Sequence, residues 1–422
     1  MGFETLATGV IFLLTYAAIV SEKIHRTVTA LVGGMLMIIL GVVSQEEAFH
    51  AIDLNVIFLL VGMMVIANVM AETGVFQWMA IRAVQLGKGR PGRVMVILAL
   101  VTAVSSSVLD NVTVIVLIAP VAIFVAGSLG VSPIPFLITS VMASNIGGAA
   151  TLVGDPPNIL IGSAADIDFF EFLVNMAPPV LISLVCYVPI MLMQFRKQLD
   201  IDPEKIEGLL HLSTEGVITN PDLLRRSLIV LGLILVAFLL ETVTHLETAT
   251  IAMAGATLLL LITGFNPARA LEKVEWSTLF FFVGLFILVE SVVEVGWIER
   301  AAGGLLRLTE GNVRITTHLL LWVSALASGI VDNIPYTAAM IPLIESLRSS
   351  MNIAPLWYAL ALGADFGGNL TLVGASANIV AANLVMHSGH RISFREFFLY
   401  GISTVFVTLV VATLWLEWAY LS

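Results

Sequence analysis

The chain has 422 residues, of which 59% are hydrophobic and 12% are charged. A mean hydropathy of +1.01 exceeds what a water-exposed surface tolerates, so the sequence predicts a polytopic membrane protein. The net charge of −11, without any basic stripe, argues against nucleic acid as a partner, and the single cysteine, Cys186, excludes a disulfide framework or a cysteine-rich metal site.

The apolar residues are gathered into stretches that suit membrane crossing. Eight of them run without interruption over a length that spans about 30 Å of hydrocarbon. They cover residues 3–21, 27–43, 54–72, 172–195, 227–243, 249–264, 276–294 and 398–418. The first lacks the basic n-region and the small-residue cleavage site of a signal peptide, and we therefore interpret it as the first span.

Four further apolar stretches are interrupted near their middle. Stretches 94–126 and 315–345 contain Ser-Asp-Asn sequence, which predicts re-entrant hairpins. Stretches 133–165 and 354–386 contain glycine-rich loops, which predict broken helices. Backbone that lacks helical hydrogen bonds is tolerated at membrane depth only inside protein or beside water. The interruptions are therefore expected to converge on one site.

The second half of the chain repeats the first. The segment Ser106-Ser107-Val108-Leu109-Asp110-Asn111 returns 222 positions later as Ser328-Gly329-Ile330-Val331-Asp332-Asn333. After a two-residue deletion, Thr151-Leu152-Val153-Gly154 returns as Thr371-Leu372-Val373-Gly374. The repeat predicts two halves, residues 3–196 and 225–420, joined by a polar linker at 197–224.

The number of crossings predicts how the halves are oriented. If the hairpins do not cross, each half crosses five times, and an odd number turns the second half upside down. The predicted fold is thus an all-α polytopic membrane protein with an inverted-topology repeat of two five-span halves, each with a re-entrant hairpin and a broken helix. Of the 19 Lys and Arg residues, all but Arg300, Arg307, Arg314 and Arg348 then fall on one side. The positive-inside rule makes that side cytoplasmic. The linker is therefore predicted to be cytoplasmic and both termini outside, on the periplasmic face of the inner membrane.

Small polar side chains surround the tip of each predicted hairpin. The N–H groups at a helix start carry partial positive charge, which hydroxyl, amide and carboxyl groups complement. The predicted substrate-binding residues here are Ser106, Ser107, Asp110, Asn111 and Thr113 in the first tip, and Ser328, Asp332, Asn333 and Thr337 in the second. As an alternative, the aspartates serve only as helix caps. A neutral serine would cap without the desolvation cost of a carboxylate.

The two glycine-rich loops carry matching polar residues. Residues 147–154 and 367–374 both read Gly-Gly-x-x-Thr-Leu-Val-Gly. Glycine permits an unwound backbone and close approach, and glycines used only for tight helix packing are the alternative. No Gly-Lys-Ser or Gly-Lys-Thr follows, which argues against a nucleotide-binding loop. The predicted substrate-binding residues here are Asn145, Thr151, Asn158, Asn369, Thr371 and Asn378.

Acidic residues break the symmetry of the repeat. Asp155 corresponds to Ala375, and Asp365 corresponds to Asn145. Carboxylates in a low-dielectric environment can exchange protons near neutral pH. Asp110, Asp155, Asp332 and Asp365 are therefore the predicted residues for proton or cation coupling.

The interrupted segments contain no basic residue in their motifs. A multiply charged anion would have to rely on helix N-termini and backbone amides against four nearby acids. The sequence therefore favours protons, small cations or a neutral hydroxylated solute. No nucleophile–base constellation or metal-ligand cluster stands out, so neither an enzyme nor a cofactor is predicted.

Together these motifs resemble the ion transporter superfamily, and within it the group of arsenite efflux permeases and P protein. The resemblance covers nearly the whole chain and rests on the Ser-x-x-Leu-Asp-Asn and Ser-x-x-Val-Asp-Asn hairpins and the Gly-Gly-x-x-Thr-Leu-Val-Gly-Asp-Pro-Pro-Asn loop. It implies that residues 3–92 and 225–312 form a scaffold that dimerises. Residues 93–196 and 313–420 would form transport parts that move in an elevator mechanism. By this resemblance, the Asp-Asn pairs of the hairpins and the Asn, Thr and Asp residues of the loops match the binding region of the family position by position.

The resemblance also implies a substrate. Proton-coupled efflux of arsenite and antimonite is the first hypothesis, because arsenite at neutral pH is mostly the uncharged trihydroxide, which amides, hydroxyls and carboxyls can hydrogen-bond. Sodium/proton exchange and P protein-like chloride transport are the second. A dicarboxylate or citrate is less favoured, because the tips read Asp-Asn-Val-Thr and Asp-Asn-Ile-Pro instead of Ser-Asn-Thr. A non-transporting membrane receptor or assembly factor is a third class.

The partners expected from this resemblance are a small inorganic solute, protons, the lipid bilayer and a second copy of the chain. An ATPase subunit, which associates with some arsenite permeases, is a further candidate.

Overall fold

The computed structural model describes residues 3–21, 23–88, 90–199 and 216–422, and the regular structure in these ranges is helical throughout. The first half contains α1 (Phe3–Ser21), α2 (Arg26–Ile39), α3 (Gln45–His50), α4 (Leu54–Ala71), α5 (Val75–Leu86), α6 (Pro91–Ser106), α7 (Asn111–Leu129), α8 (Ile134–Gly148), α9 (Pro156–Ala165) and α10 (Phe169–Phe195). Most of the predicted linker, residues 200–215, lies outside the described residues.

The second half follows the same order. It contains α12 (Pro221–Leu239), α13 (Glu241–Thr244), α14 (Thr248–Thr263), α15 (Pro267–Glu272), α16 (Trp276–Glu294), α17 (Trp297–Thr309), α18 (Val313–Val331), α19 (Asn333–Ser346), α20 (Ala354–Gly367), α21 (Ser376–His387), α22 (Phe394–Leu416) and the π-helix η1 (Glu417–Leu421). The predicted all-α class is confirmed.

Each of the eight uninterrupted apolar stretches coincides with one helix, namely α1, α2, α4, α10, α12, α14, α16 or α22. Among the described residues, six helical segments are long and apolar enough to cross a membrane. Four of the six contain predicted spans, namely α4, α10, α16 and α22, and the other two are hairpin arms, α7 and α18. A 19-residue arm is therefore long enough to cross by length alone, and only its packing distinguishes it from a span.

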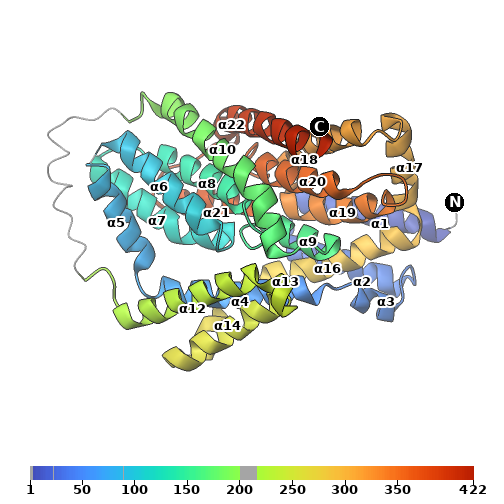
Figure 1. Cartoon of the computed structure of the whole chain (residues 1–422), viewed down its shortest axis with the longest axis horizontal. Helices are drawn as coiled ribbons and strands as arrows, with labels where there is room; N and C mark the ends of the chain where they lie inside the picture. Colours follow the sequence, from blue (N-terminus) through green and yellow to red (C-terminus); the bar gives the residue numbers. More distant parts are fainter. Residues whose placement is uncertain (1–2, 22, 89, 200–215) are drawn as a thin grey trace.

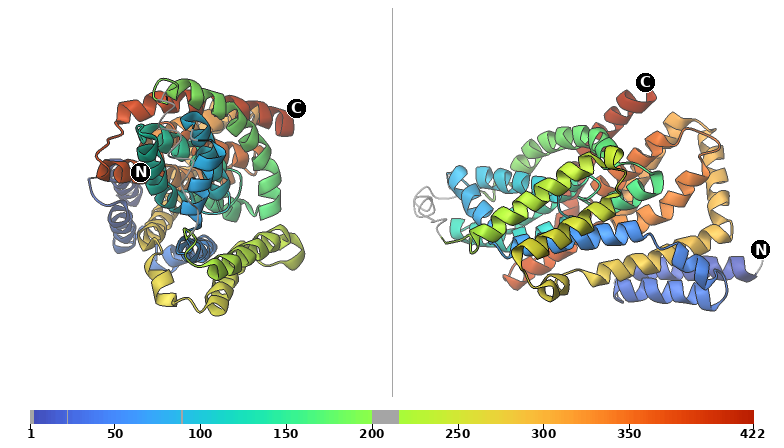
Figure 2. Two further views of the ribbon diagram at one scale, coloured as in Figure 1. Left: turned by 90° about the vertical axis from the view of Figure 1, so that its left-hand side faces the viewer. Right: turned by 60° about the horizontal axis from the view of Figure 1, so that its bottom comes forward.

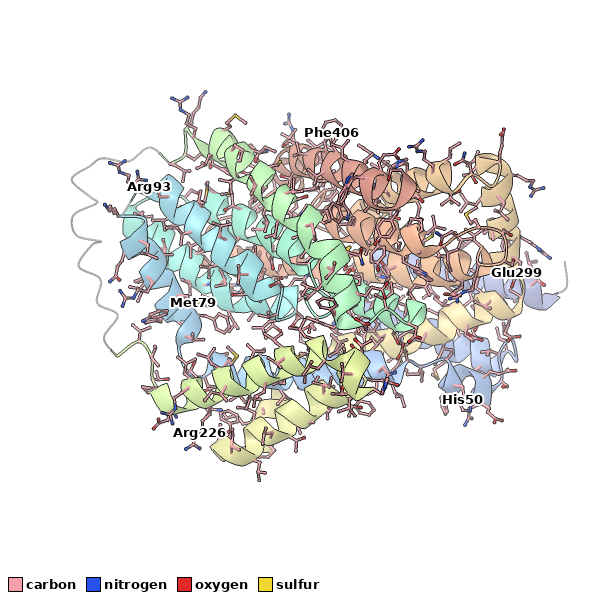
Figure 3. All side chains as sticks on the ribbon, in the orientation of Figure 1. His50, Met79, Arg93, Arg226, Glu299 and Phe406 are labelled. Carbon is pink, nitrogen blue, oxygen red and sulfur yellow. The ribbon has the colours of Figure 1, made fainter. Side chains whose placement is uncertain are left out.

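The two hairpins enter from opposite ends of the molecule. Figure 1 shows α6 and α7 on the left and α18 and α19 on the right, so their turns meet near the middle. Figure 3 places Arg93 and Arg226, both predicted to be cytoplasmic, toward the left end, and Glu299 at the right end. This arrangement agrees with an inverted repeat, whose orientation in a membrane stays a prediction.

The helices form two layers. Helices α2, α4, α12, α14 and α16 lie along the bottom of Figure 1, and the segments α6–α10 and α18–α22 lie above them; the views in Figure 2 agree with this division. Contacts between helices follow the repeat, since α2 packs on α16 and α14 on α4, while α6 packs on α8 and α18 on α20. We refer to the two layers as the scaffold and the transport part. Their separate movement stays a prediction.

Small residues set how closely these helices approach. A Cβ on Gly147 would lie 2.3 Å from the carbonyl oxygen of Ala103, and one on Gly367 would lie 2.4 Å from that of Ala325. Neither loop glycine has a positive φ. Close packing of α8 on α6 and of α20 on α18, which was the alternative interpretation, therefore accounts for both of these glycines.

Candidate functional site

The aspartates at the two hairpin tips both cap the helix that follows. Asp110 Oδ1 accepts from the backbone N–H of Thr113 at 3.0 Å, and Asp332 Oδ1 accepts from that of Ile334 at 3.1 Å. Capping is thus part of each role, as the alternative interpretation held. One oxygen of each carboxylate is left for another partner.

Asp332 also forms the turn itself. It ends α18 and begins α19 as a single residue, with φ of 70° and ψ of 137°. A positive φ is costly for a residue with a Cβ and persists only where its surroundings enforce it. The second tip is therefore tighter than the first, where residues 107–110 separate α6 from α7.

Asp155 joins the two hairpins at the centre of the transport part. Its Oδ2 accepts from Asn111 Nδ2 at 2.7 Å, and its Oδ1 accepts from Asn333 Nδ2 at 3.1 Å. The side chains come from residues far apart in the sequence, and all three are buried. Asp155, which has no acidic equivalent in the second half of the repeat, therefore bridges the two halves.

A chain of amides continues from this bridge. Asn111 Nδ2 also lies 3.3 Å from Asn145 Oδ1, and Asn145 Nδ2 donates to Asn369 Oδ1 and Asn378 Oδ1, each at 3.0 Å. These predicted site residues thus form one buried network. Because amides have both donors and acceptors, they connect the loops without adding charge.

Asp365 and Asn158 occupy the equivalent positions in the other half, and there the network is incomplete. Asp365 lies beside Asn158. Within the described parts of the chain, both carboxyl oxygens of Asp365 lack a hydrogen-bond partner, and so does Oδ1 of Asn158. Asp365 is fully buried. These three buried oxygens therefore lack the kind of donor that Asn145 supplies to Asn378 Oδ1.

Most of the remaining predicted residues hold the loops to the hairpins. Thr151 Oγ1 donates to the carbonyl of Ser107 and Thr371 Oγ1 to that of Gly329, both at 2.6 Å. Asn158 and Asn378 each donate to two carbonyls of their own loop. These donors are occupied by backbone, so binding of a solute by them would require local rearrangement.

The predicted serines and Thr337 differ in whether their hydroxyl groups have a hydrogen-bond partner outside their own helix. Ser106 accepts from Ser144 at 3.0 Å, and Ser328 donates to the carbonyl of Ala364 at 2.6 Å. Ser107 donates within its own helix, to the carbonyl of Val104. Thr337 Oγ1 is buried and unpaired within the described residues.

A small cavity at the meeting point of the tips includes two residues that the sequence did not single out. It is lined by Asp110, Asn111, Asp155 and Asn333 and, from the scaffold, by Arg26 and Glu275. The space that the centre of a water molecule can occupy in this cavity is about 10 Å³, which is close to the minimum needed to hold one water. Arg26 Nη1 lies 3.3 Å from Asp332 Oδ2 and also contacts Ser376. The site therefore contains a basic residue after all, supplied from outside the interrupted motifs.

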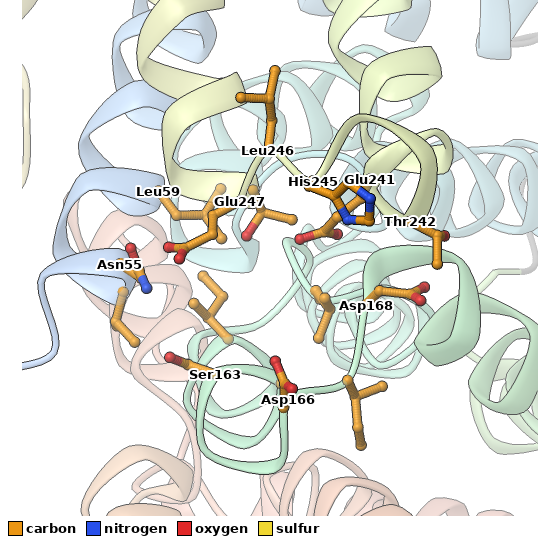
Figure 4. A pocket seen from close by; sticks show the side chains of 16 residues that line it. Asn55, Leu59, Ser163, Asp166, Asp168, Glu241, Thr242, His245, Leu246 and Glu247 are labelled. Carbon is orange, nitrogen blue, oxygen red and sulfur yellow. The ribbon is translucent and has the colours of Figure 1, made fainter.

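A larger cleft of about 460 Å³ lies elsewhere between the scaffold and the transport part. Figure 4 shows Asp166, Asp168, Glu241 and Glu247 around it, with Ser163 at the end of α9. It reaches Leu152 and Ile159, the sequence neighbours of Thr151 and Asn158. We assign the candidate site to the small cavity, because the residues of both hairpin tips line it.

Relatives of the chain are transporters and membrane proteins. The sequence model described as citrate transporter matches residues 16–363. An uncharacterized transporter of Mycobacterium tuberculosis is 42% identical over 418 residues, or 97% of each chain. The 46 kDa membrane protein of Mycobacterium leprae is 41% identical over 97% of this chain and 98% of its own.

More distant relatives extend the likeness. The human P protein is 32% identical over 98% of this chain and 59% of its own length. The crystal structure of the YdaH transporter of Alcanivorax borkumensis, reported to have an unusual topology, superposes with a TM-score of 0.58 over 98% of both chains at 14% identity. The last likeness concerns the fold alone. The resemblance inferred from the hairpin and loop motifs is confirmed.

Proposed function

The chain belongs to the citrate transporter family and is a secondary transporter, and we propose that it exports arsenite and antimonite in exchange for protons. Its site combines buried amides with carboxylates and sits between two hairpin tips. Such a constellation suits a small solute that offers hydroxyl groups for hydrogen bonding.

Proton coupling is supported by the absence of a hydrogen-bond donor for both carboxyl oxygens of Asp365 and for Asn158 Oδ1 within the described residues. In the other half, Asn145 supplies the donor that satisfies Asn378 Oδ1. A proton on Asp365 supplies the equivalent donor to Asn158 Oδ1 and removes the cost of burying bare acceptors, about 1–3 kcal/mol for each unsatisfied group. A small cation between the two oxygens would do the same.

The choice of solute rests on charge. Asp110, Asp155 and Glu275 line the cavity together with a single arginine. Because acids outnumber bases there, an uncharged trihydroxide or a cation fits better than an anion. The cavity must also open to admit a solute, since it has room for about one water.

Arg26 is the observation that favours a second candidate. A guanidinium beside the tips could receive a carboxylate or chloride if it left Asp332. Transport of citrate or of chloride therefore remains the alternative, with sodium/proton exchange as the cation counterpart.

The mode of movement belongs to the same proposal. We place the protein in the inner membrane with both termini outside and with the scaffold as the dimer contact. The transport part would carry the site along the scaffold in an elevator movement. An ATPase subunit is an additional partner to test by copurification.

One assay separates these functions. Everted vesicles that are acidified inside should take up arsenite, and Asp110→Asn and Asp332→Asn should each reduce the uptake. The same vesicles are tested with sodium, chloride and citrate, with a pH dye as a second readout. Arsenite uptake that is absent in wild type, or unchanged in both variants, would overturn the assignment, and a response to another solute would replace it.

A further inference from the structure

Arg26 connects the scaffold to the transport part at the tip of one hairpin only. It begins α2, and its guanidinium lies 5.3 Å from the centre of the Phe281 ring on α16. From this position Nη1 reaches Asp332 Oδ2 at 3.3 Å. The two groups therefore lie on opposite sides of the boundary along which an elevator would slide.

The contact pairs a largely buried carboxylate with a partly exposed guanidinium. Ser376 Oγ donates to the same Asp332 Oδ2 at 2.9 Å and also contacts Arg26. The side chain of Asp332 is 11% exposed and that of Arg26 is 28% exposed. A carboxylate this buried is costly to keep ionised without a cation, and a guanidinium that remains charged satisfies it.

In the repeat, only one of the two hairpin-tip aspartates has an arginine at the corresponding scaffold position. The residue 222 positions after Arg26 is Thr248, and the equivalent of Asp332 is Asp110. Thr248 lines the larger cleft, and Val56, the equivalent of Thr278, lines it too, whereas Arg26 and Thr278 line the small cavity. The two pockets thus use equivalent scaffold positions, but the small cavity has an arginine there, whereas the larger cleft has Thr248 at that position and His245 elsewhere in its lining.

Other ionisable groups face Asp332 from the elements around it. Asp155 at the start of α9 interacts electrostatically with Asp332, Asp110 and Asp365. Glu275 at the start of α16 interacts with Asp110 and with Arg26. All of these neighbours except Arg26 are acidic, so none of them can replace its charge.

We propose that Arg26 is a built-in counter-cation that displaces a proton from Asp332, a coupling carboxyl additional to Asp365, at one end of the transport cycle. When the tip reaches Arg26, the O–H bond of protonated Asp332 breaks, the proton leaves to water on that face, and the carboxylate pairs with the guanidinium. When the transport part moves away, Asp332 loses its cation and takes up a proton on the other face. Arg26 thereby gives proton release a direction. This inference rests on the proposed proton coupling and assigns a positioning residue to it.

The first test compares Arg26→Gln, Arg26→Lys and the control Arg269→Gln in proteoliposomes of known orientation. Wild type should show different pH profiles of transport when the pH is varied on one face or on the other. Arg26→Gln should make the two profiles coincide and lower proton-driven flux about tenfold, the effect of roughly 1.4 kcal/mol of lost pairing. Arg269→Gln, whose ion pair with Glu72 lies outside the cavity, should keep both the asymmetry and the solute exchange without a gradient within about twofold of wild type, and Arg26→Lys should restore the asymmetry. Equal loss of flux from both faces, with the asymmetry kept, would overturn the proposal.

A second measurement needs no transported solute, so it separates this inference from the assignment of the substrate. In a Cys186→Ser background, Val112→Cys places a thiol in the wall of the small cavity. Its maleimide labelling rate, relative to an exposed Ser349→Cys reporter, should depend on pH in wild type. The dependence should disappear with Arg26→Gln and return with Arg26→Lys. Identical pH dependence with and without Arg26 would contradict the proposal even if the solute is unknown.

Discussion

At the scale of residues, replacing one carboxyl oxygen of Asp365 by an amide nitrogen tests whether this residue carries a proton. We predict that Asp365→Asn folds normally, because its amide donates to Asn158 Oδ1 as Asn145 does to Asn378. Solute exchange should persist, whereas proton-driven transport should be lost, since the amide cannot release its proton. The comparison variant Asp365→Ala leaves Asn158 unpaired and should lower stability by about 1–3 kcal/mol. Retained proton coupling in Asp365→Asn would exclude Asp365 as the proton carrier.

Asp332 combines a charge with an unusual backbone conformation, and two variants separate these roles. Asn has the same shape as the Asp that adopts φ of 70° and ψ of 137° at this position and can still cap α19, so Asp332→Asn should keep the melting temperature close to that of wild type while transport falls. Asp332→Ala should lose the cap and strain the turn, for a combined cost of about 2–3 kcal/mol. Thermal unfolding in detergent measures the difference. A melting temperature lowered equally by both variants would contradict it.

The sequence predicted the residues of this site better than their roles. The repeat led to Asp110, Asp332 and the loop asparagines, because duplicated polar residues in apolar sequence are rare. Arg26 and Glu275 carried no such signal, since they stand at the ends of ordinary spans and meet the tips only through packing. The one usable hint was the mismatch of Arg26 with Thr248 across the repeat, because Glu275 corresponds to another acid, Asp53.

At the scale of helices, packing of the interrupted helices depends on glycine as a small residue. We predict that Gly147→Ala lowers stability by about 1–3 kcal/mol, because its Cβ would meet backbone of Ala103 that cannot rotate away. Gly127→Ala on α7 is the matched control: a Cβ there meets nothing within 4 Å, so it should be neutral or stabilise by about 0.5–1 kcal/mol. Thermal unfolding of both variants in detergent is the measurement. Equal effects would refute the packing role.

An ion-pair cluster joins the scaffold helices of the two halves. Glu72 at the end of α4 contacts Lys273 and, at 2.8 Å, Arg269. The hydrogen bond from Lys273, aided by Arg269, lowers the pKa of Glu72 below its ordinary 4.5. A lowered carboxyl pKa stabilises the folded state above the unfolded pKa, and this stability is lost as pH falls through the folded pKa.

Glu72→Gln tests this cluster. At pH 7 we expect a loss of only about 0.5–1 kcal/mol, because the basic partners are largely exposed and salt screens them. Wild type and variant should become equally stable once the pH is well below 4.5, the ordinary value for Glu72. Unfolding in nanodiscs between pH 7 and 3 checks this, and a gap that persists at low pH would point to packing instead of charge.

At the scale of the whole molecule, the repeat suggests what the other end of the transport cycle looks like. Arg26 contacts Ser376 in the present arrangement, and their equivalents across the repeat are Thr248 and Pro156. Inverted repeats exchange conformations between their halves when access alternates. Thr248 should therefore approach Pro156 after the transport part has moved along the scaffold.

Two pairs of cysteines in a Cys186→Ser background test this movement. Arg26→Cys with Ser376→Cys should be joined by a short bis-methanethiosulfonate cross-linker in the arrangement described here, because the contact is made by the end of the long arginine side chain, and Thr248→Cys with Pro156→Cys should be joined in the opposite arrangement. Each cross-link should stop transport, and reduction of its disulfides should restore it, because locking either end of an alternating cycle blocks turnover. A proton gradient that speeds one pair should slow the other, since both report one equilibrium. If only the first pair ever forms, the transport part does not slide along the scaffold, and coupling must instead depend on local opening of the hairpin tips.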